Sequence, residues 1–150
     1  MTNVRLFLDS NVILSGLISS KGSPRILLDL LSIEVPLLKG ITGQYNLDEI
    51  ERNLARRFPE LLSVYREYLP RIHLAVIEIP AYEEIAALTE VMSPKDAPVL
   101  AATLAGKADY LVTGNKKDFP KKSADPIRVV TPSDFLNKVL PNLIMSSLPS

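Results

Sequence analysis

The chain has 150 residues, a length typical of one domain. It contains no cysteine and a single histidine, which excludes disulfides, thiolate zinc sites and thiol nucleophiles and leaves only His73 for a histidine-based site. The 17 basic and 17 acidic residues cancel, so net charge gives no indication of nucleic-acid binding. We expect neither a signal peptide nor a membrane-spanning segment, and therefore a soluble, cytoplasmic protein.

The pattern of apolar residues predicts five strands that alternate with helices. The first strand covers residues 4–8, which are rich in strand formers, and a helix over residues 12–18 begins soon after Asp9. The later strands are expected at residues 35–41, 74–79, 109–113 and 127–130. The later helices are expected at residues 24–33, 47–58, 60–69, 83–92, 96–105 and 132–140. This alternation predicts an α/β fold with a mainly parallel sheet.

Residue types that favour helix ends divide these elements. Asn46 is expected to cap the helix that follows it, Gly106 to end a helix, and Thr131 to cap the last one. Residues 141–150 carry no charged side chain. We expect residues 1–140 to form the folded domain, followed by an apolar tail that either frays or packs against a partner.

Acidic and amide side chains lie at the predicted strand ends and helix starts. Asp9 directly follows the first strand, and Glu49 lies in the first turn of the helix after the second. The loop after the fourth strand contains Asn115 and Asp118. Because strand carboxyl ends and helix N-termini meet at one edge of a parallel sheet, these side chains are expected to share that edge. Asp96, which opens a helix, reaches it only if the preceding helix returns the chain there.

If Asp9, Glu49 and Asp96 converge, their charges need a partner. Two carboxylates 4 Å apart repel by about 4 kcal/mol at an effective dielectric near 20. Such a group persists only when it is protonated or holds a cation. Oxygen ligands without cysteine or a nearby histidine favour Mg²⁺ or Mn²⁺ over zinc. An ion of this kind can polarise a phosphate and activate water, so the predicted chemistry is phosphodiester hydrolysis.

Each acid also has a purely structural interpretation. Asp9 is a good helix N-cap. Glu49 can interact favourably with the helix dipole or form surface ion pairs with Arg52 and Arg56. Asp96 fits a capping-box pattern. Only their joint placement favours a functional site.

Three stretches of the sequence resemble the PIN-domain family: LFLDSNVILSGL, LDEIERNL and KDAPVLAATLAGKADYLVTGNKKDF. The resemblance covers nearly all of residues 3–140 and is closest to the single-domain, VapC-like toxins of bacterial and archaeal toxin–antitoxin pairs. It implies a five-stranded parallel sheet in the order 3-2-1-4-5, flanked by helices. It also implies a Mg²⁺- or Mn²⁺-dependent ribonuclease that acts on single-stranded RNA. The expected partners are that RNA, a cognate antitoxin protein and further copies of the chain, in a homodimer or larger assembly.

The resemblance also assigns roles to individual residues. It implies that Asp9, Glu49 and Asp96 bind the metal and act in catalysis. Asn11 matches a polar position near the metal, and Thr113 matches a position at the rim of the site.

The sequence departs from the family at its fourth acid. That acid normally follows Thr-Gly directly, where this chain has Asn115, which offers an oxygen without a negative charge. Asp118, three residues later, is the candidate replacement in catalysis. The departure leaves open a second function, in which a catalytically weakened domain binds RNA or protein.

Basic and aromatic residues near the acids are candidates for RNA contact. The basic candidates are Arg52, Arg56, Arg57, Lys116, Lys117, Lys121 and Lys122, for which a role in solubility is the alternative. Tyr45 and Phe119 are the nearest aromatics, and packing is the expected role of both. His73 is expected to be structural.

The sequence argues against one other function and leaves a second one open. A phosphatase of the haloacid dehalogenase kind needs an acid two residues after Asp9, where this chain has Asn11. A protein-interaction module would use the apolar tail over residues 143–148 to bind a second copy or an inhibitor.

Overall fold

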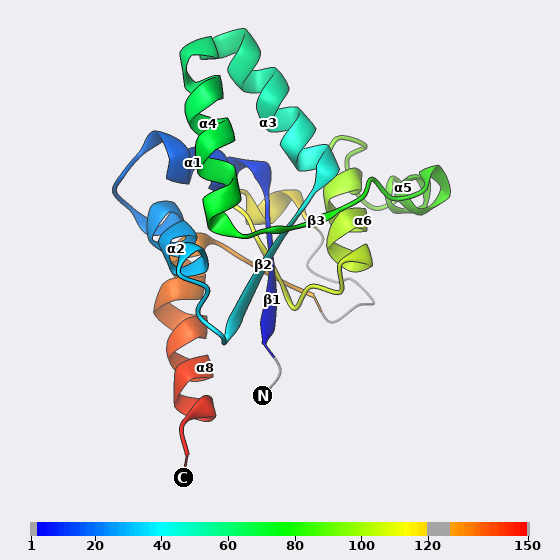
Figure 1. Cartoon of the computed structure of the whole chain (residues 1–150). Helices are drawn as coiled ribbons and strands as arrows, with labels where there is room; N and C mark the ends of the chain where they lie inside the picture. The colour runs from blue at the N-terminus through cyan, green and yellow to red at the C-terminus, as the bar shows by residue number, and fades with distance from the viewer. Residues whose placement is uncertain (1–2, 120–126, 150) are drawn as a thin grey trace.

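The computed structural model describes residues 3–119 and 127–149 of the chain. A five-stranded parallel sheet forms its centre, in the order β3-β2-β1-β4-β5, so the first strand lies in the middle (Figure 1). The strands are β1 (Val4–Leu8), β2 (Leu38–Gly43), β3 (Ala75–Ile77), β4 (Tyr110–Val112) and β5 (Arg128–Val130). This confirms the predicted fold class and strand order.

Helices connect the strands and cover both faces of the sheet (Figure 1). Those before β3 are α1 (Ser10–Ile18), α2 (Ser23–Ser32), α3 (Gln44–Arg57) and α4 (Leu62–Tyr68). Those after β3 are α5 (Tyr82–Leu88), α6 (Ala97–Ala105), α7 (Pro132–Asp134) and α8 (Leu140–Ser147). Short 3-10 turns cover Pro59–Leu61, Leu69–Ile72 and Lys116–Asp118, and a π-helical turn covers Phe135–Val139.

The central strand β1 is buried on both faces of the sheet. Leu6 and Leu8 belong to a hydrophobic cluster with α1, α2 and α3, whereas Phe7 belongs to a second cluster with α6. Successive side chains of a strand point to opposite faces, so this apolar run contributes to both layers of the core. Asp9, the next residue, therefore lies at the carboxyl edge of the sheet.

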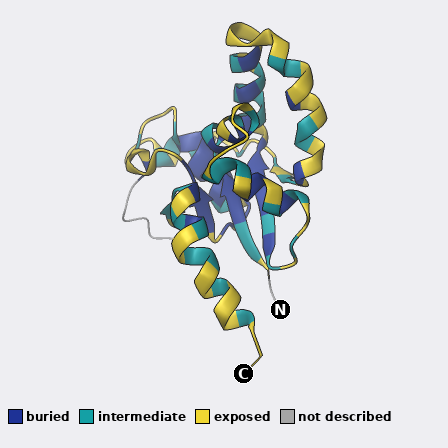
Figure 2. Cartoon of the chain, turned by 90° about the vertical axis from the view of Figure 1, so that its left-hand side faces the viewer, coloured by how far each residue is buried: buried dark blue, intermediate teal, exposed yellow. Residues whose placement is uncertain are grey.

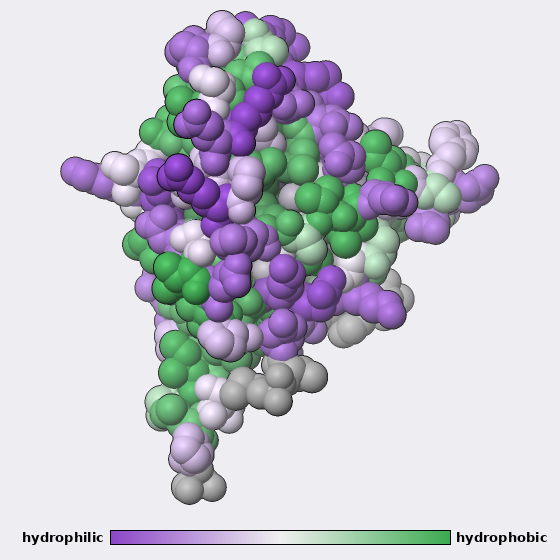
Figure 3. Space-filling view, viewed as in Figure 1, coloured by the Kyte–Doolittle hydropathy of each residue, from purple (hydrophilic) through white to green (hydrophobic). Residues whose placement is uncertain are grey.

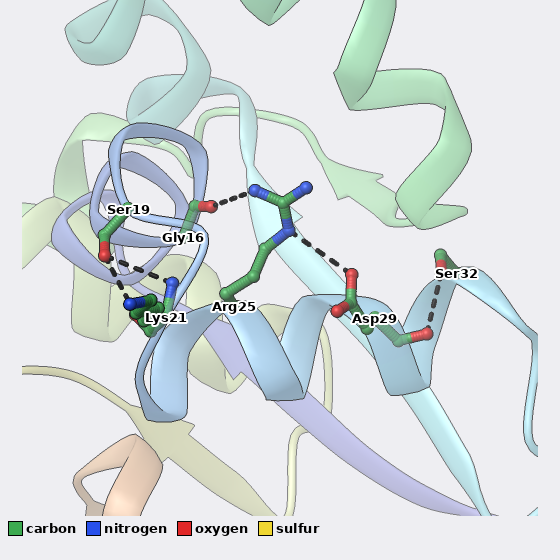
Figure 4. A network of polar contacts seen from close by, with 6 residues as sticks. All are labelled: Gly16, Ser19, Lys21, Arg25, Asp29 and Ser32. Atoms are coloured by element: carbon green, nitrogen blue, oxygen red, sulfur yellow. Dashed lines mark hydrogen bonds and ion pairs between the residues drawn. The ribbon is translucent and has the colours of Figure 1, made fainter.

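The two helices that follow β1 pack closely through Gly16 and are linked by one arginine. Arg25 of α2 donates a hydrogen bond from Nη1 to the Gly16 carbonyl of α1 at 3.1 Å and one from Nε to Asp29 at 3.4 Å (Figure 4). Its guanidinium also lies 5.1 Å from the ring centroid of Tyr68. Arg25 therefore connects α1, α2 and α4.

Helices α3 and α4 form an arm that extends past the sheet (Figure 1). Ile50 and Leu54 of α3 and Tyr65 of α4 are buried in the first cluster. The outward sides of the arm are exposed (Figure 2). The inward side of α3 therefore belongs to the core along most of the helix, while its outward side faces solvent.

Two element starts differ from the sequence prediction by three residues, and the other starts differ by at most two. Strand β2 begins at Leu38 rather than residue 35, because a turn in which the Leu38 N–H donates to the Val35 carbonyl precedes it. Helix α3 begins at Gln44 with Gly43 as its cap residue, so the predicted cap Asn46 lies inside the helix and is buried. The cap prediction was wrong because the side chain of Asn46 makes a tertiary contact with Asp9 and Ser10, and this contact outweighs the local preference of Asn for helix starts.

Two helix ends differ from the prediction by four residues or more. Helix α5 ends at Leu88, four residues before the predicted end. The last helical segment was expected to end at residue 140, but α8 continues to Ser147. In the described part of the chain, residues 141–147 are thus helical rather than frayed.

Helix α8 projects from the body of the molecule (Figures 1 and 2). It exposes Ile144, Met145 and Leu148 near its end, and hydrophobic residues are visible along it in Figure 3. In the ranges 3–119 and 127–149, no helix combines the length and hydropathy needed to cross a membrane.

Candidate functional site

Asp9 occupies the junction between β1 and α1, a position that agrees with both of the interpretations drawn from the sequence. It is the N-cap residue of α1, and its Oδ1 accepts the Ser10 backbone N–H at 2.8 Å. Its Oδ2 accepts the hydroxyl of Thr113, a buried residue directly after β4, at 2.8 Å. The same carboxylate lines a cavity, so capping and a functional role are compatible.

One cavity of about 200 Å³ brings together the acids that the sequence places far apart. It opens at the carboxyl edge of the sheet, where β1 and β4 end and α3 and α6 begin. Its oxygen-bearing lining residues include Asp9, Asn11, Glu49, Asp96, Asn115 and Asp118. The chain therefore does return Asp96 to this edge, as the functional interpretation requires.

Two carboxylates of the cavity have raised pKa values, so they ionise less readily than free carboxylic acids. Burial raises the pKa of Asp9; hydrogen bonds from Thr113 and Ser10 oppose the rise, and the charges of Glu49 and Asp96 add to it. Burial also raises the pKa of Asp96, as does Asp118. Neighbouring carboxylates thus contribute to the raised pKa of Asp9 and of Asp96, so a cation in the cavity would stabilise the charged forms of these two residues.

The donors around the cavity suit a hard divalent cation. They are carboxylate and amide oxygens, the ligands that Mg²⁺ and Mn²⁺ prefer, with no imidazole or thiolate among them. Asp9 is the strongest indication, because its carboxylate is partly buried and a desolvated carboxylate gains most from a neighbouring cation. Among the described residues, no three Asp, Glu, His or Cys side chains are already gathered into a metal-binding cluster. The acids instead surround a shared space, as expected for like charges.

Comparison with known proteins identifies the family. The model of the PIN domain family matches residues 5–117. The chain belongs to the PIN domain family. No curated protein matches the sequence.

A solved structure has a similar fold. It is the crystal structure of VapBC2 from Rickettsia felis bound to a DNA fragment from their promoter, in which one chain matches with a TM-score of 0.62. The match covers 84% of this chain and 98% of that chain at 17% sequence identity. At this identity, the likeness concerns the fold.

Asn46 of this PIN domain contacts Asp9, although its type and sequence position predict a helix cap. It lies on α3, one turn before Glu49, and its side chain is fully buried. Its Nδ2 donates to Ser10 Oγ at 2.9 Å and to Asp9 Oδ1 at 3.3 Å. The available signal was its spacing from Glu49, because residues three apart share a helix face.

The polar residues at the rim of the PIN domain's cavity connect the loop after β4 to the strand ends. Asn11 Oδ1 accepts the Gly114 N–H at 3.0 Å, and Thr113 Oγ1 accepts the Asn115 N–H at 3.2 Å. Both side chains therefore hold the start of the loop that carries Asn115 and Asp118.

The predicted basic residues are distributed unevenly. Lys116 pairs with Asp134 at 3.1 Å, and Arg56 donates to Asn53. Arg52, Arg57 and Lys117 are exposed, while Lys121 and Lys122 lie outside the described residues. Lys95, which the sequence analysis did not select, lines the cavity beside Asp96.

The remaining candidates have structural contacts. Phe119 is buried in the second hydrophobic cluster. The Tyr45 hydroxyl donates to the Lys95 carbonyl at 3.4 Å. His73 lines a different cavity, where its Nδ1 lies 3.0 Å from Glu34 Oε1. These positions agree with the packing and structural roles expected from the sequence.

Proposed function

We propose that this PIN domain is a metal-dependent endoribonuclease that hydrolyses phosphodiester bonds of single-stranded RNA. The observation that carries the proposal is the single cavity at the sheet edge that Asp9, Glu49, Asp96 and Asp118 all line. Carboxylates from four separate segments have no common structural task there, and their proximity helps to raise the pKa of Asp9 and of Asp96, which makes the charged forms of these two less stable. A site for a divalent cation explains why the fold brings them together.

In the proposed site, Asp9, Glu49 and Asp96 would hold Mg²⁺ or Mn²⁺. The bound ion would polarise the phosphate and lower the pKa of an attacking water. Asp118 is the candidate for a further catalytic carboxylate, and Asn115 would contribute a neutral oxygen. Thr113 orients Asp9 through the hydrogen bond to Oδ2.

Basic side chains around the cavity would bind the RNA backbone. Lys95 lies in the cavity lining, and Arg52, Arg56 and Lys117 are exposed on the neighbouring elements. Lys116 is a weaker candidate because Asp134 neutralises part of its charge. Phosphate contacts of this kind carry no sequence information by themselves, so we expect weak sequence preference.

Cleavage of labelled single-stranded RNA in Mn²⁺, Mg²⁺ or EDTA tests the nuclease proposal. We expect cleavage only with the metals. Asp9→Asn and Asp96→Asn should each lower the rate by more than about 100-fold, since even groups that only support a metal ligand contribute about 10–100-fold. Glu67→Gln, at an exposed position on α4, is the matched control and should cleave at the wild-type rate. Undiminished cleavage by both aspartate variants would disprove the proposed site.

The neutral Asn115 favours one alternative, a weakened PIN domain that binds RNA or protein without cutting. Fluorescence anisotropy with the same RNA separates the two functions. Binding without cleavage in either metal would support the alternative. Faster cleavage by Asn115→Asp than by wild type would support the nuclease. It would also show that the missing fourth carboxylate limits the rate of cleavage.

We further propose that the chain is the toxin of a toxin–antitoxin pair, with a cognate antitoxin and a second copy of itself as partners. The likeness of its fold to a chain of VapBC2 supports this biological role. Expression in bacteria should arrest growth, and Asp9→Asn should relieve the arrest. Equal arrest by the variant at equal protein level would contradict a nuclease toxin.

A further inference from the structure

We propose that Asn46 is a positioning residue that orients the Asp9 carboxylate for a divalent cation, an inference that rests on the proposed nuclease function. Asn46 lies on the buried side of α3, among apolar residues such as Ile50 and Leu54, and its exposed fraction is 0%. Burying an amide is unfavourable unless its polar atoms are used. The contacts of Asn46 show how its nitrogen is used.

The side-chain nitrogen of Asn46 helps to hold both the Asp9 carboxylate and the Ser10 side chain in place. Nδ2 donates to Asp9 Oδ1 at 3.3 Å and to Ser10 Oγ at 2.9 Å. The other carboxylate oxygen, Oδ2, accepts from Thr113. Asp9 is therefore held from two elements, α3 and the end of β4, in addition to its own helix. Contacts on both oxygens restrict rotation of the carboxylate, which is what a preorganised ligand needs.

The oxygen of Asn46 shows that this arrangement is not optimal for stability. Oδ1 is buried and has no hydrogen-bond partner among the described residues. Asn46 Oδ1 has room because residue 43 is glycine. A Cβ atom at position 43 would lie 2.9 Å from this oxygen. An unpaired buried carbonyl is destabilising, and an apolar side chain of similar shape would avoid it. A residue selected only for packing would therefore be expected to be apolar.

The matched experiment compares Asn46→Leu with Ile50→Leu, a volume-conserving change one turn along the same buried face. Mn²⁺ affinity is measured by calorimetry, thermal stability without metal by circular dichroism, and RNA cleavage by kcat and KM. We expect Asn46→Leu to keep or raise Tm, weaken Mn²⁺ binding by about tenfold and lower kcat with KM unchanged. Ile50→Leu should leave Mn²⁺ affinity unchanged.

Other outcomes have distinct meanings. If wild type binds Mn²⁺ and Asn46→Leu binds it equally well, Asn46 is a packing residue and only this inference fails. If wild type itself binds no Mn²⁺, the proposed function fails and the inference fails with it. Should Asn46→Leu not fold, Asn46→Ser retains a hydroxyl donor, and an affinity between those of wild type and Asp9→Asn would support positioning, whereas wild-type affinity would overturn it.

Discussion

At the scale of single residues, Asp9 combines a structural role with the chemical role that we propose for it. Its carboxylate starts α1 by accepting the Ser10 N–H, and it also lines the candidate metal-binding cavity. Burial raises its pKa, whereas the hydrogen bonds from Ser10 and Thr113 favour the charged form. The protein thus has an acid at a position where an uncharged cap residue would make the folded state more stable. Such departures from the most stable choice are common at functional sites that need a charge.

Tyr65 provides a test of buried polar groups away from the site. Its hydroxyl is buried without a hydrogen-bond partner among the described residues, and burial, with smaller contributions from Glu51 and Asp48, raises its pKa to about 12. Tyr65→Phe should therefore leave the free energy of unfolding at neutral pH unchanged or raise it by about 1 kcal/mol.

The pH dependence of the same variant follows from the sign of the shift. The unfolded chain ionises Tyr65 near its ordinary pKa of 10.0, and the folded chain only near about 12. Its contribution to stability is therefore complete below pH 10 and is lost as the pH rises through 12. Urea unfolding at pH 8 and pH 11 should show a smaller alkaline loss for Tyr65→Phe than for wild type. The exposed Tyr82→Phe is the control, and an equal loss in both variants would contradict the assignment.

At the scale of elements, the packing of α1 on α2 depends on the absence of a side chain at one position. A Cβ at Gly16 would overlap Leu28 Cδ1 and lie 3.3 Å from the Pro24 carbonyl oxygen. Leu28 is fully buried and cannot move into solvent. The Gly16 carbonyl also accepts from Arg25, so a shift of α1 would strain that contact (Figure 4).

We therefore predict that Gly16→Ala destabilises the protein by about 1–3 kcal/mol, the usual effect of overpacking. The intrinsic preference of Ala for helices acts in the opposite direction but is smaller. Urea unfolding measures the change, with the exposed Ser15→Ala on the same helix as control. A Gly16→Ala protein as stable as the control would show that α1 and α2 can separate freely.

At the scale of the whole molecule, the parallel topology collects the candidate residues. The ends of β1 and β4 and the starts of α3 and α6 all lie at one edge, although they are distant in sequence. A cation held there would connect these segments in the folded state alone. Ligands that bind only the folded state raise its stability by mass action.

Mn²⁺ should accordingly raise the Tm of the whole domain. At 100 times the dissociation constant, the gain is about 2.7 kcal/mol, or about 5–10 °C for a chain of this size. EDTA should reverse the shift. The double variant Asp9→Asn with Asp96→Asn should show no shift, whereas Glu67→Gln should respond as wild type does. Equal shifts in the double variant and wild type would place the ion elsewhere.

The resemblance to the PIN-domain family implied the order of the strands. The sequence by itself determined the α/β class and the positions of the acids at strand ends. These depend on local patterns: the apolar run of β1, the acid directly after it and the glycine after α6 are each visible within a few residues. The start of α3 and the end of α8 were misplaced, because helix boundaries also depend on contacts with distant segments.

Only the tertiary structure decided which side chains meet. It brought Asp96 to the edge where Asp9 lies, added Lys95 to the cavity, and showed that Asn46 contacts the carboxylate instead of capping a helix. No local pattern contains this information, because these residues lie up to 87 positions apart and come together only when α3 and α6 pack on the two faces of the sheet. The physical reason is that side-chain burial and orientation are set by packing between segments, which a single stretch of sequence does not specify.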